Sequence, residues 1–381
     1  MKKFIAFALC LILILACLSG CNKNGETVDF ESAADMYFTD SEPAGFIPYK
    51  INLVDGSIYI PCPDPLCPHT ADTQTCPFSK CAATLVTDGG RYMFYSAKRY
   101  ADMTDIINCY DTKENKTELV YECKTGMPNY LIYGDGRLYF DLPQVKEVDG
   151  VIIRGVRRDV MCYDPVSKQI SRYGEMDEHD WLICAEDGYL VYRTASESIA
   201  CKTTGSFDGS DVISLPEGHE YSPFDYWCVG KGFIARCYSP ASIYLYDEKR
   251  LLDMPKQLDG KTIMVVTRTG DNFYFNLSGA ESDGGFYENT VYIVGKDGKS
   301  NAFTVKSKYN FYTLKGYEHY IIGSVLNKFD NGIELDENDF DKTLIRIDLY
   351  TGSASVYTFS SSVGSGIVSE EITVSVTEEK L

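Results

Sequence analysis

The chain has 381 residues, of which 44% are hydrophobic, so it can bury a large core. It carries 36 Lys and Arg against 55 Asp and Glu; residues 21–381 retain 34 of these cations and all the acids, a net charge of −21. Such a chain repels phosphate backbones, which excludes the cation-driven binding on which nucleic-acid recognition depends.

The N-terminus has the form of an export signal. Lys2 and Lys3 precede an apolar run at residues 4–17, which is shorter than the roughly 20 residues of a membrane-spanning helix. The run ends in Leu-Ser-Gly-Cys, which resembles the lipobox of bacterial lipoproteins. We therefore predict a signal peptide at 1–20 and a diacylglycerol on Cys21, enough for stable anchoring. The alternative is an ordinary secretory signal with an incidental Cys21.

Residues 21–34 would then be the lipidated cysteine and a polar tether. The predicted location is the extracytoplasmic face of the cell membrane, with the membrane as a partner through the lipid. Residues 35–381 are predicted to form one all-β domain. Helical periodicity is nearly absent there, whereas short runs rich in Tyr, Phe, Val and Ile recur between Gly, Asp and Asn.

Two phrases repeat along this domain. One is a turn into an aromatic strand, as in residues 135–140 (DGRLYF) and 187–192 (DGYLVY), and its glycine returns after 38 to 52 residues. The other is a strand that ends near Asp before a polar turn, as in residues 162–165 (CYDP) and 347–352 (IDLYTG). Asp, Asn and Gly suit these turns because their backbones accept left-handed conformations cheaply.

A unit of about 45 residues with two hairpins has the length of a four-stranded propeller blade. Six units begin from Gly90 onward and residues 36–56 supply another, so we predict a single β-propeller of seven four-stranded antiparallel blades, with six blades as the alternative. The strand Glu371 to Thr377 is expected to complete the first blade and close the ring. Tandem β-sandwiches are the competing fold, but they lack so regular a repeat.

A Cys- and Pro-rich insertion occupies residues 61–81, where five prolines predict a stiff loop. Cys62, Cys67, His69 and Cys76 could form a closed structural zinc site of three thiolates and one imidazole. Together with Cys81, the segment also admits two disulfides in three possible pairings, or unlinked thiols. In each case the expected role is structural, and zinc is a possible rather than a certain cofactor.

With these repeats and this loop, the chain resembles a family of exported bacterial lipoproteins, common in anaerobic Gram-positive bacteria, with TolB-like propeller repeats. The resemblance covers residues 35–360 and includes the loop pattern C-x4-C-x-H, here Cys62, Cys67 and His69, with another Cys downstream. It implies a propeller fold and a location outside the cytoplasm, and it implies no reaction.

Two further loops are candidates for ligand contacts. Residues 330–341 carry six carboxylates, of which Asp336, Asp339 and Asp341 could converge on Ca²⁺; the spacing is not that of an EF-hand, and a solvated loop is the simpler explanation. A second loop holds three aromatic residues that could line a ligand-facing rim, since binding residues favour loops. These are Tyr221, Tyr226 and Trp227.

No catalytic motif accompanies the fold. The chain lacks a G-x-S-x-G elbow, a P-loop and an H-E-x-x-H pair, and four histidines leave little for Ser-His or Cys-His chemistry. We therefore predict no catalytic residues and a cell-surface binding or scaffold module for a protein, peptide or glycan. The alternative is a carboxylate-dependent glycan hydrolase or lyase, because such enzymes need only two positioned acids.

Overall fold

The computed structural model describes most of the chain from Ala34 onward. The described residues are 34–42, 45–60, 62, 64, 67, 76, 81–87, 91–99, 104–124, 126, 128–148, 151–186, 188–196, 198–203, 205–206, 212–217, 227–230, 232–237, 241–277, 279–282, 284–330, 332–336, 341–359 and 367–381. The predicted signal peptide and Cys21 lie outside these ranges. Within them, no helix has the length and apolar character needed to cross a bilayer.

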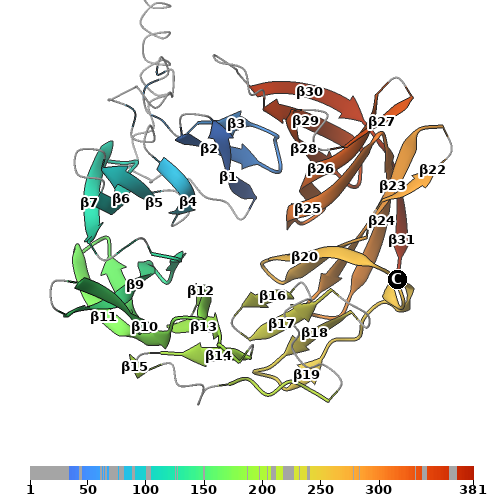
Figure 1. Cartoon of the computed structure of the whole chain (residues 1–381). Helices are drawn as coiled ribbons and strands as arrows, with labels where there is room; N and C mark the ends of the chain where they lie inside the picture. Colours follow the sequence, from blue (N-terminus) through green and yellow to red (C-terminus); the bar gives the residue numbers. More distant parts are fainter. Residues whose placement is uncertain are drawn as a thin grey trace, which may run out of the picture.

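The strands form seven sheets that follow one another around a ring (Figure 1), and we number these sheets as blades 1 to 7. Blade 1 holds β1 (Asp35–Glu42), β2 (Gly45–Asn52) and β3 (Ile58–Tyr59). Blade 2 holds β4 (Cys81–Thr87), β5 (Tyr92–Arg99), β6 (Thr104–Asp111) and β7 (Lys116–Cys123). Blade 3 holds β8 (Leu131–Gly134), β9 (Arg137–Val148), β10 (Val151–Asp164), β11 (Gln169–Asp177) and β15 (Gly205–Ser206). Blade 4 holds β12 (Trp181–Glu186), β13 (Tyr189–Arg193) and β14 (Ile199–Lys202).

The remaining blades complete the ring. Blade 5 holds β16 (Trp227–Gly230), β17 (Phe233–Arg236), β18 (Ser242–Leu245) and β19 (Arg250–Leu251), and the short helix η1 (Lys256–Leu258) follows it. Blade 6 holds β20 (Ile263–Thr269), β21 (Asn272–Leu277), β22 (Ala280–Ser282), β23 (Phe286–Gly295), β24 (Ser300–Ser307) and β31 (Ser375–Lys380). Blade 7 holds β25 (Tyr309–Tyr317), β26 (Tyr320–Asp330), β27 (Ile333–Asp336), β28 (Lys342–Asp348), β29 (Ser353–Phe359) and β30 (Ile367–Thr373).

The predicted seven-bladed all-β propeller is confirmed, but the expectation of four strands in every blade is wrong. In the described part of the chain, blades 1 and 4 have three strands and blades 3, 6 and 7 have five or six. In blade 4, the position of a fourth strand is taken by a short segment that makes only an isolated bridge between Val212 and Ala200 and a 2.8 Å hydrogen bond from the Ile213 N–H to the Ile199 carbonyl.

Both repeated phrases form hairpin turns. Asp135 and Gly136 make the turn between β8 and β9 with φ values of 52° and 71°, a conformation that Asp and Gly adopt at low cost. In the second phrase, the Asp164 carboxylate accepts hydrogen bonds from the N–H groups of Val166 (2.8 Å) and Ser167 (3.1 Å). Each of the two repeated phrases therefore corresponds to one hairpin turn of a blade.

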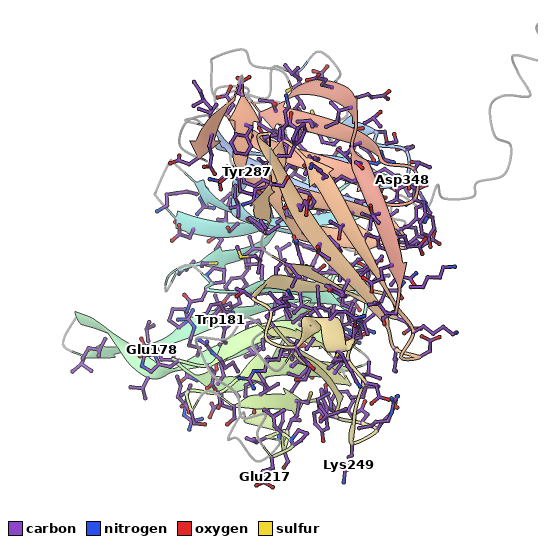
Figure 2. The ribbon with its side chains drawn as sticks, turned by 90° about the vertical axis from the view of Figure 1, so that its right-hand side faces the viewer. Glu178, Trp181, Glu217, Lys249, Tyr287 and Asp348 are labelled. Atoms are coloured by element: carbon purple, nitrogen blue, oxygen red, sulfur yellow. The ribbon has the colours of Figure 1, made fainter. Side chains whose placement is uncertain are left out.

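The turns of both phrases lie on one face of the ring, which we call the short-turn face. Figure 2 shows Lys249 and Asp348, which belong to such turns, on one side of the molecule. Glu178, Trp181 and Tyr287 lie toward the other side, where the longer connections run. Any feature built from neighbouring short turns must therefore appear on the short-turn face.

The predicted closure of the ring by residues 371–377 is wrong. β30 pairs with β29 in blade 7, and β31 pairs with β24 in blade 6, so neither strand joins blade 1. Both pairings close shorter loops than a return to the start of the chain would, and shorter loops cost less entropy. Blade 1 instead contacts blade 7 through side chains: Arg346 donates hydrogen bonds to the Leu53 and Val54 carbonyls, and the Tyr357 hydroxyl donates to the Gly56 carbonyl at 2.7 Å.

Candidate functional site

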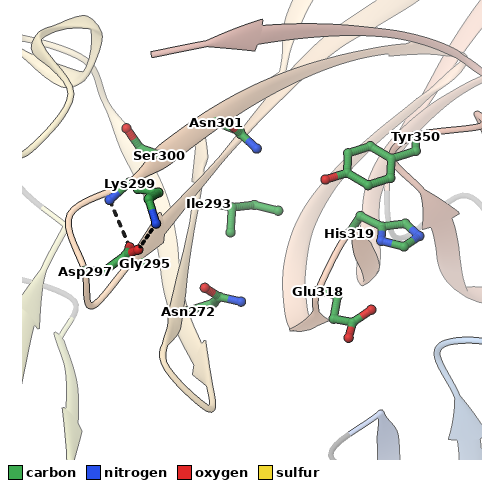
Figure 3. Close-up of a pocket in the computed structure, with 10 residues that line it drawn as sticks. All are labelled: Asn272, Ile293, Gly295, Asp297, Lys299, Ser300, Asn301, Glu318, His319 and Tyr350. Atoms are coloured by element: carbon green, nitrogen blue, oxygen red, sulfur yellow. Dashed lines mark hydrogen bonds and ion pairs between the residues drawn. The ribbon is translucent and has the colours of Figure 1, made fainter.

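A groove of about 560 Å³ lies between blades 6 and 7 on the short-turn face (Figure 3). Its walls come from four turns: the starts of β21 and β24, the β25–β26 turn and the β28–β29 turn. The lining residues are Asn272, Ile293, Gly295, Asp297, Lys299, Ser300, Asn301, Glu318, His319 and Tyr350. A space of this size accommodates a small ligand.

One wall of the groove is aromatic. The His319 ring lies between Tyr320 and Tyr350, with ring centroids at 4.2 Å and 4.3 Å, and it is stacked on Tyr350 at an interplanar angle of 16°. Tyr350 is 59% exposed, so its ring remains available at the edge of the groove. The stack orders an aromatic platform that would otherwise be a mobile side chain in a turn.

The Asp348 carboxylate contacts both residues of this platform. Burial opposes ionisation of its carboxyl group, but hydrogen bonds from the Thr351 side chain and from the N–H groups of Tyr350 and Thr351 together lower its pKa. His319 Nε2 also lies 3.7 Å from Asp348 Oδ1. The carboxylate therefore fixes the backbone of Tyr350 and the position of the His319 ring.

The other wall is polar. Asn301 and Ser300 lie at the start of β24, and Asn272 lies at the start of β21. Lys299 Nζ is 2.7 Å from Asp297 Oδ2, and its hydrogen bond lowers the pKa of Asp297. Asp297 is consequently ionised at neutral pH and accepts hydrogen bonds rather than donating a proton.

A smaller groove of about 350 Å³ occupies the corresponding place between blades 2 and 3. Its charged side chains pair with one another: Arg91 Nη2 lies 2.9 Å from Asp111 Oδ2, and Lys168 Nζ lies 2.5 Å from Glu118 Oε2. Val166 takes the place in the β10–β11 turn that Tyr350 takes in the β28–β29 turn, two residues after the turn aspartate. Tyr92 and Tyr163 also line this groove but are buried, so it lacks an exposed ring in the place of Tyr350.

The Cys-rich insertion brings three thiols together. The Sγ atoms of Cys62, Cys67 and Cys76 lie within 4.8 Å of one another; Cys67 and Cys76 are buried and Cys62 is half-buried. The Cys67 N–H donates to the Asp64 carbonyl at 3.1 Å, and the Asp64 N–H faces the Cys62 sulfur. Cys62 and Cys67 are not joined by a disulfide. Tetrahedral zinc would place its sulfur ligands roughly 3.8 Å apart, so the cluster could hold a metal ion.

The surroundings of the thiols are apolar. They pack on Met93, Tyr95 and Tyr110 of blade 2. Burial raises the pKa of Cys62 and raises the pKa of Tyr110 to about 12, to which the nearby Cys62 and Cys76 contribute. His69 lies outside the described residues, as does the side chain of Cys81, the first residue of β4. Their predicted part in the cluster stays a prediction.

The other predicted sites are less complete. Trp227 begins β16, but its side chain, Tyr221 and Tyr226 lie outside the described residues. Asp336 ends β27 and Asp341 is exposed just before β28, whereas Asp339 is outside the described part. Among the described side chains, the three cysteines are the one group of three that could hold a metal ion. The calcium loop and the aromatic rim remain predictions.

Comparisons with known proteins bear on the fold alone. No protein-family model matches the chain, and no curated protein does. An acylaminoacyl peptidase bound to a chloromethyl ketone matches 88% of this chain at 12% identity and a TM-score of 0.49. The β-propeller domain of the Trilobed protease from Pyrococcus furiosus matches 82% at 11% and 0.47, and TolB from Acinetobacter baumannii matches 71% at 11% and 0.36.

The chain spans 50% of that peptidase, 62% of TolB and 88% of the separate propeller domain. The sheets themselves define the class of protein as a seven-bladed β-propeller, in which the body of the chain forms one ring.

Proposed function

We propose that the chain is a lipid-anchored, extracytoplasmic β-propeller that binds a glycan, without catalysis, in the groove between blades 6 and 7. The observation that carries the proposal is the exposed Tyr350 ring, ordered by His319, facing amide and hydroxyl side chains across a groove of about 560 Å³. Binding sites for small ligands combine an apolar or aromatic surface with a few placed polar groups.

The chemistry of the two walls fits a sugar. The apolar face of a sugar ring packs on an aromatic ring, while Asn272 and Asn301 offer both donors and acceptors to hydroxyl groups. Asp297 and Lys299 neutralise each other and Glu318 adds a further carboxylate, so the groove does not favour an anionic ligand. A peptide is a poorer fit because common modes of peptide recognition use a sheet edge, a hydrophobic groove or an aromatic-lined groove, whereas this groove sets one exposed aromatic ring opposite polar side chains.

The proposal is tested by removing the aromatic ring of Tyr350. Tyr350→Ala should weaken retardation of the protein in gels that contain soluble bacterial polysaccharides by at least about fivefold, since one aromatic contact contributes on the order of 1 kcal/mol. Val166→Ala, at the matching turn position between blades 2 and 3, should leave retardation unchanged.

Equal effects of the two substitutions, or a wild-type protein that no polysaccharide in the panel retards, would contradict the glycan proposal. Release of new reducing or unsaturated ends from a retained polysaccharide would instead support the alternative of a carboxylate-dependent hydrolase or lyase.

We also infer that Zn²⁺ is the ion of the thiol cluster, with the predicted His69 as its fourth ligand. Thiolates prefer soft or borderline ions, and zinc accepts three thiolates and one imidazole in a closed tetrahedral site. What supports this is the approach of Cys62, Cys67 and Cys76 to within 4.8 Å. Elemental analysis of protein purified without added metal should find one zinc per chain.

A further inference from the structure

Neighbouring blades are held together by hydrophobic clusters that contain side chains from both. Between blades 6 and 7, for example, Tyr274 and Phe303 pack with Phe311 and Ile345. Five other pairs of neighbouring blades, including blades 7 and 1, share a cluster of this kind in the described part of the chain. Burial of apolar surface from both sides is what keeps a ring of separate sheets closed.

The seam between blades 1 and 2 is built differently. Its cluster contains Met93, Tyr95, Ala97 and Tyr110 of blade 2, together with the cysteines, and no described residue of blade 1. The thiols therefore occupy the place that apolar side chains of a neighbouring blade fill elsewhere.

Blade 1 presents its apolar side to blade 7. Tyr49 and Ile51 of β2 belong to the cluster shared with blade 7, and side chains alternate along a strand. Lys50, between them, is directed to the opposite side; its Nζ lies 2.7 Å from Asp35 Oδ2, and both side chains are buried. Among the described side chains, the side of blade 1 nearer blade 2 thus carries a buried ion pair.

The chain runs from blade 1 to blade 2 through the cysteines. Cys62 stands three residues after β3 and, like the buried Cys67 and Cys76, packs on the sheet of blade 2. A metal ion bound by all three sulfurs would connect the end of blade 1 to the surface of blade 2. Metal binding in such a segment adds its free energy to folding, because the unfolded chain holds no preformed site.

We propose that this metal site is a clasp that ties blade 1 to blade 2; the inference rests on the proposed zinc site. Removing the metal leaves the three thiols unlinked, so the segment after β3 is no longer tied to the sheet of blade 2. The contacts of Arg346 and Tyr357 still join blade 1 to blade 7, so the ring opens at one seam and the other blades stay folded.

Hydrogen exchange measured by mass spectrometry tests the clasp on the full chain. Chelation of the purified protein should accelerate exchange in β1–β5 at least tenfold, leave β16–β19 unchanged, and be reversed by added Zn²⁺. Cys67→Ser should reproduce the chelated pattern. Cys184→Ser, a half-buried cysteine in the seam between blades 4 and 5, is the matched control and should keep both its zinc and a protected β1–β5.

The outcomes separate the two proposals. Zinc that is bound and released with no change of exchange in β1–β5 overturns the clasp and leaves the zinc site intact. Protein that contains no metal and gains no protection from added Zn²⁺ overturns both. The chelation arm needs no substitution, so it decides the matter even where Cys67→Ser does not fold.

Discussion

At the scale of single residues, an aspartate at the end of a strand stabilises one turn after another around the ring. Asp111, Asp164 and Asp348 each accept two backbone N–H groups from the turn that follows. Asp111 also pairs with Arg91 at 2.9 Å. Burial opposes its ionisation, but Arg91 and the N–H groups of the turn outweigh that cost and lower its pKa.

The substitution Asp111→Asn separates the contribution of the ion pair to stability from that of the hydrogen bonds in the turn. The amide keeps an oxygen for the backbone N–H groups but loses the ion pair, so we expect a loss of up to about 1 kcal/mol at pH 7, small because Arg91 is exposed. A carboxyl whose pKa is lowered by folding stabilises above its unfolded pKa of about 3.9, and that contribution disappears as the pH falls through the folded value.

The difference between wild type and Asp111→Asn in urea unfolding should therefore shrink to zero near pH 2. Asp253→Asn, at an exposed position outside the turns, serves as the control and should show no difference at either pH. A difference that persists at pH 2 would mean that the ion pair is not its source.

At the level of single residues, the sequence predicted the turns but did not predict the groove. The repeated D-G and Y-D phrases predicted hairpins, and the structure contains them. Tyr350, His319 and Asn272 belong to the same phrases but come from two blades. Nothing in one repeat shows which residues of the next blade it will meet, so the groove escaped prediction.

At the scale of elements, the last two strands bind two different blades. β30 completes blade 7 and β31 crosses to blade 6, with the buried Val374 between them. The crossing passes over Gly352: the Val374 N–H donates to the Gly352 carbonyl at 2.9 Å, and a Cβ on Gly352 would lie 2.4 Å from the Val374 carbonyl oxygen.

Gly352→Ala should therefore lower the free energy of unfolding by more than the backbone strain of an alanine at positive φ would. Gly136→Ala is the matched control, because Gly136 has a similar φ of +71° against +73° and open space around it. We expect about 1 kcal/mol for Gly136→Ala from the left-handed backbone and at least about 2 kcal/mol for Gly352→Ala, measured by urea unfolding. Equal losses of stability in the two variants would show that the backbone between β30 and β31 shifts at little cost to accommodate the added Cβ.

The sequence placed a strand near the C-terminus but assigned it the wrong partner. A strand pattern fixes which side chains alternate, whereas the identity of the neighbouring strand depends on the length of the connection and on exposed edges elsewhere. The outer edges of β24 and β29 were available close by, and no pattern in residues 367–380 identifies them.

At the scale of the whole molecule, the predicted anchor at Cys21 would hold the ring at the cell surface. Growth of cells with labelled palmitate should label the wild-type protein and leave Cys21→Ala unlabelled, since the predicted acyl chains are carried by the Cys21 sulfur. Cys10→Ala, within the apolar run of the signal, is the control and should be labelled like wild type. Equal labelling of Cys21→Ala and wild type would contradict lipidation at this residue.

The described chain enters the propeller on the short-turn face. Ala34 is buried there, and its carbonyl accepts a 2.9 Å hydrogen bond from the Leu53 N–H, next to the turn that Arg346 contacts. Twelve residues separate Cys21 from Ala34, and the thirteen steps between the two Cα atoms reach about 45 Å at full extension. An anchor at Cys21 would thus keep the groove between blades 6 and 7 on the side nearest the bilayer, so that it samples polymers attached to the envelope and meets few of those that diffuse in the medium.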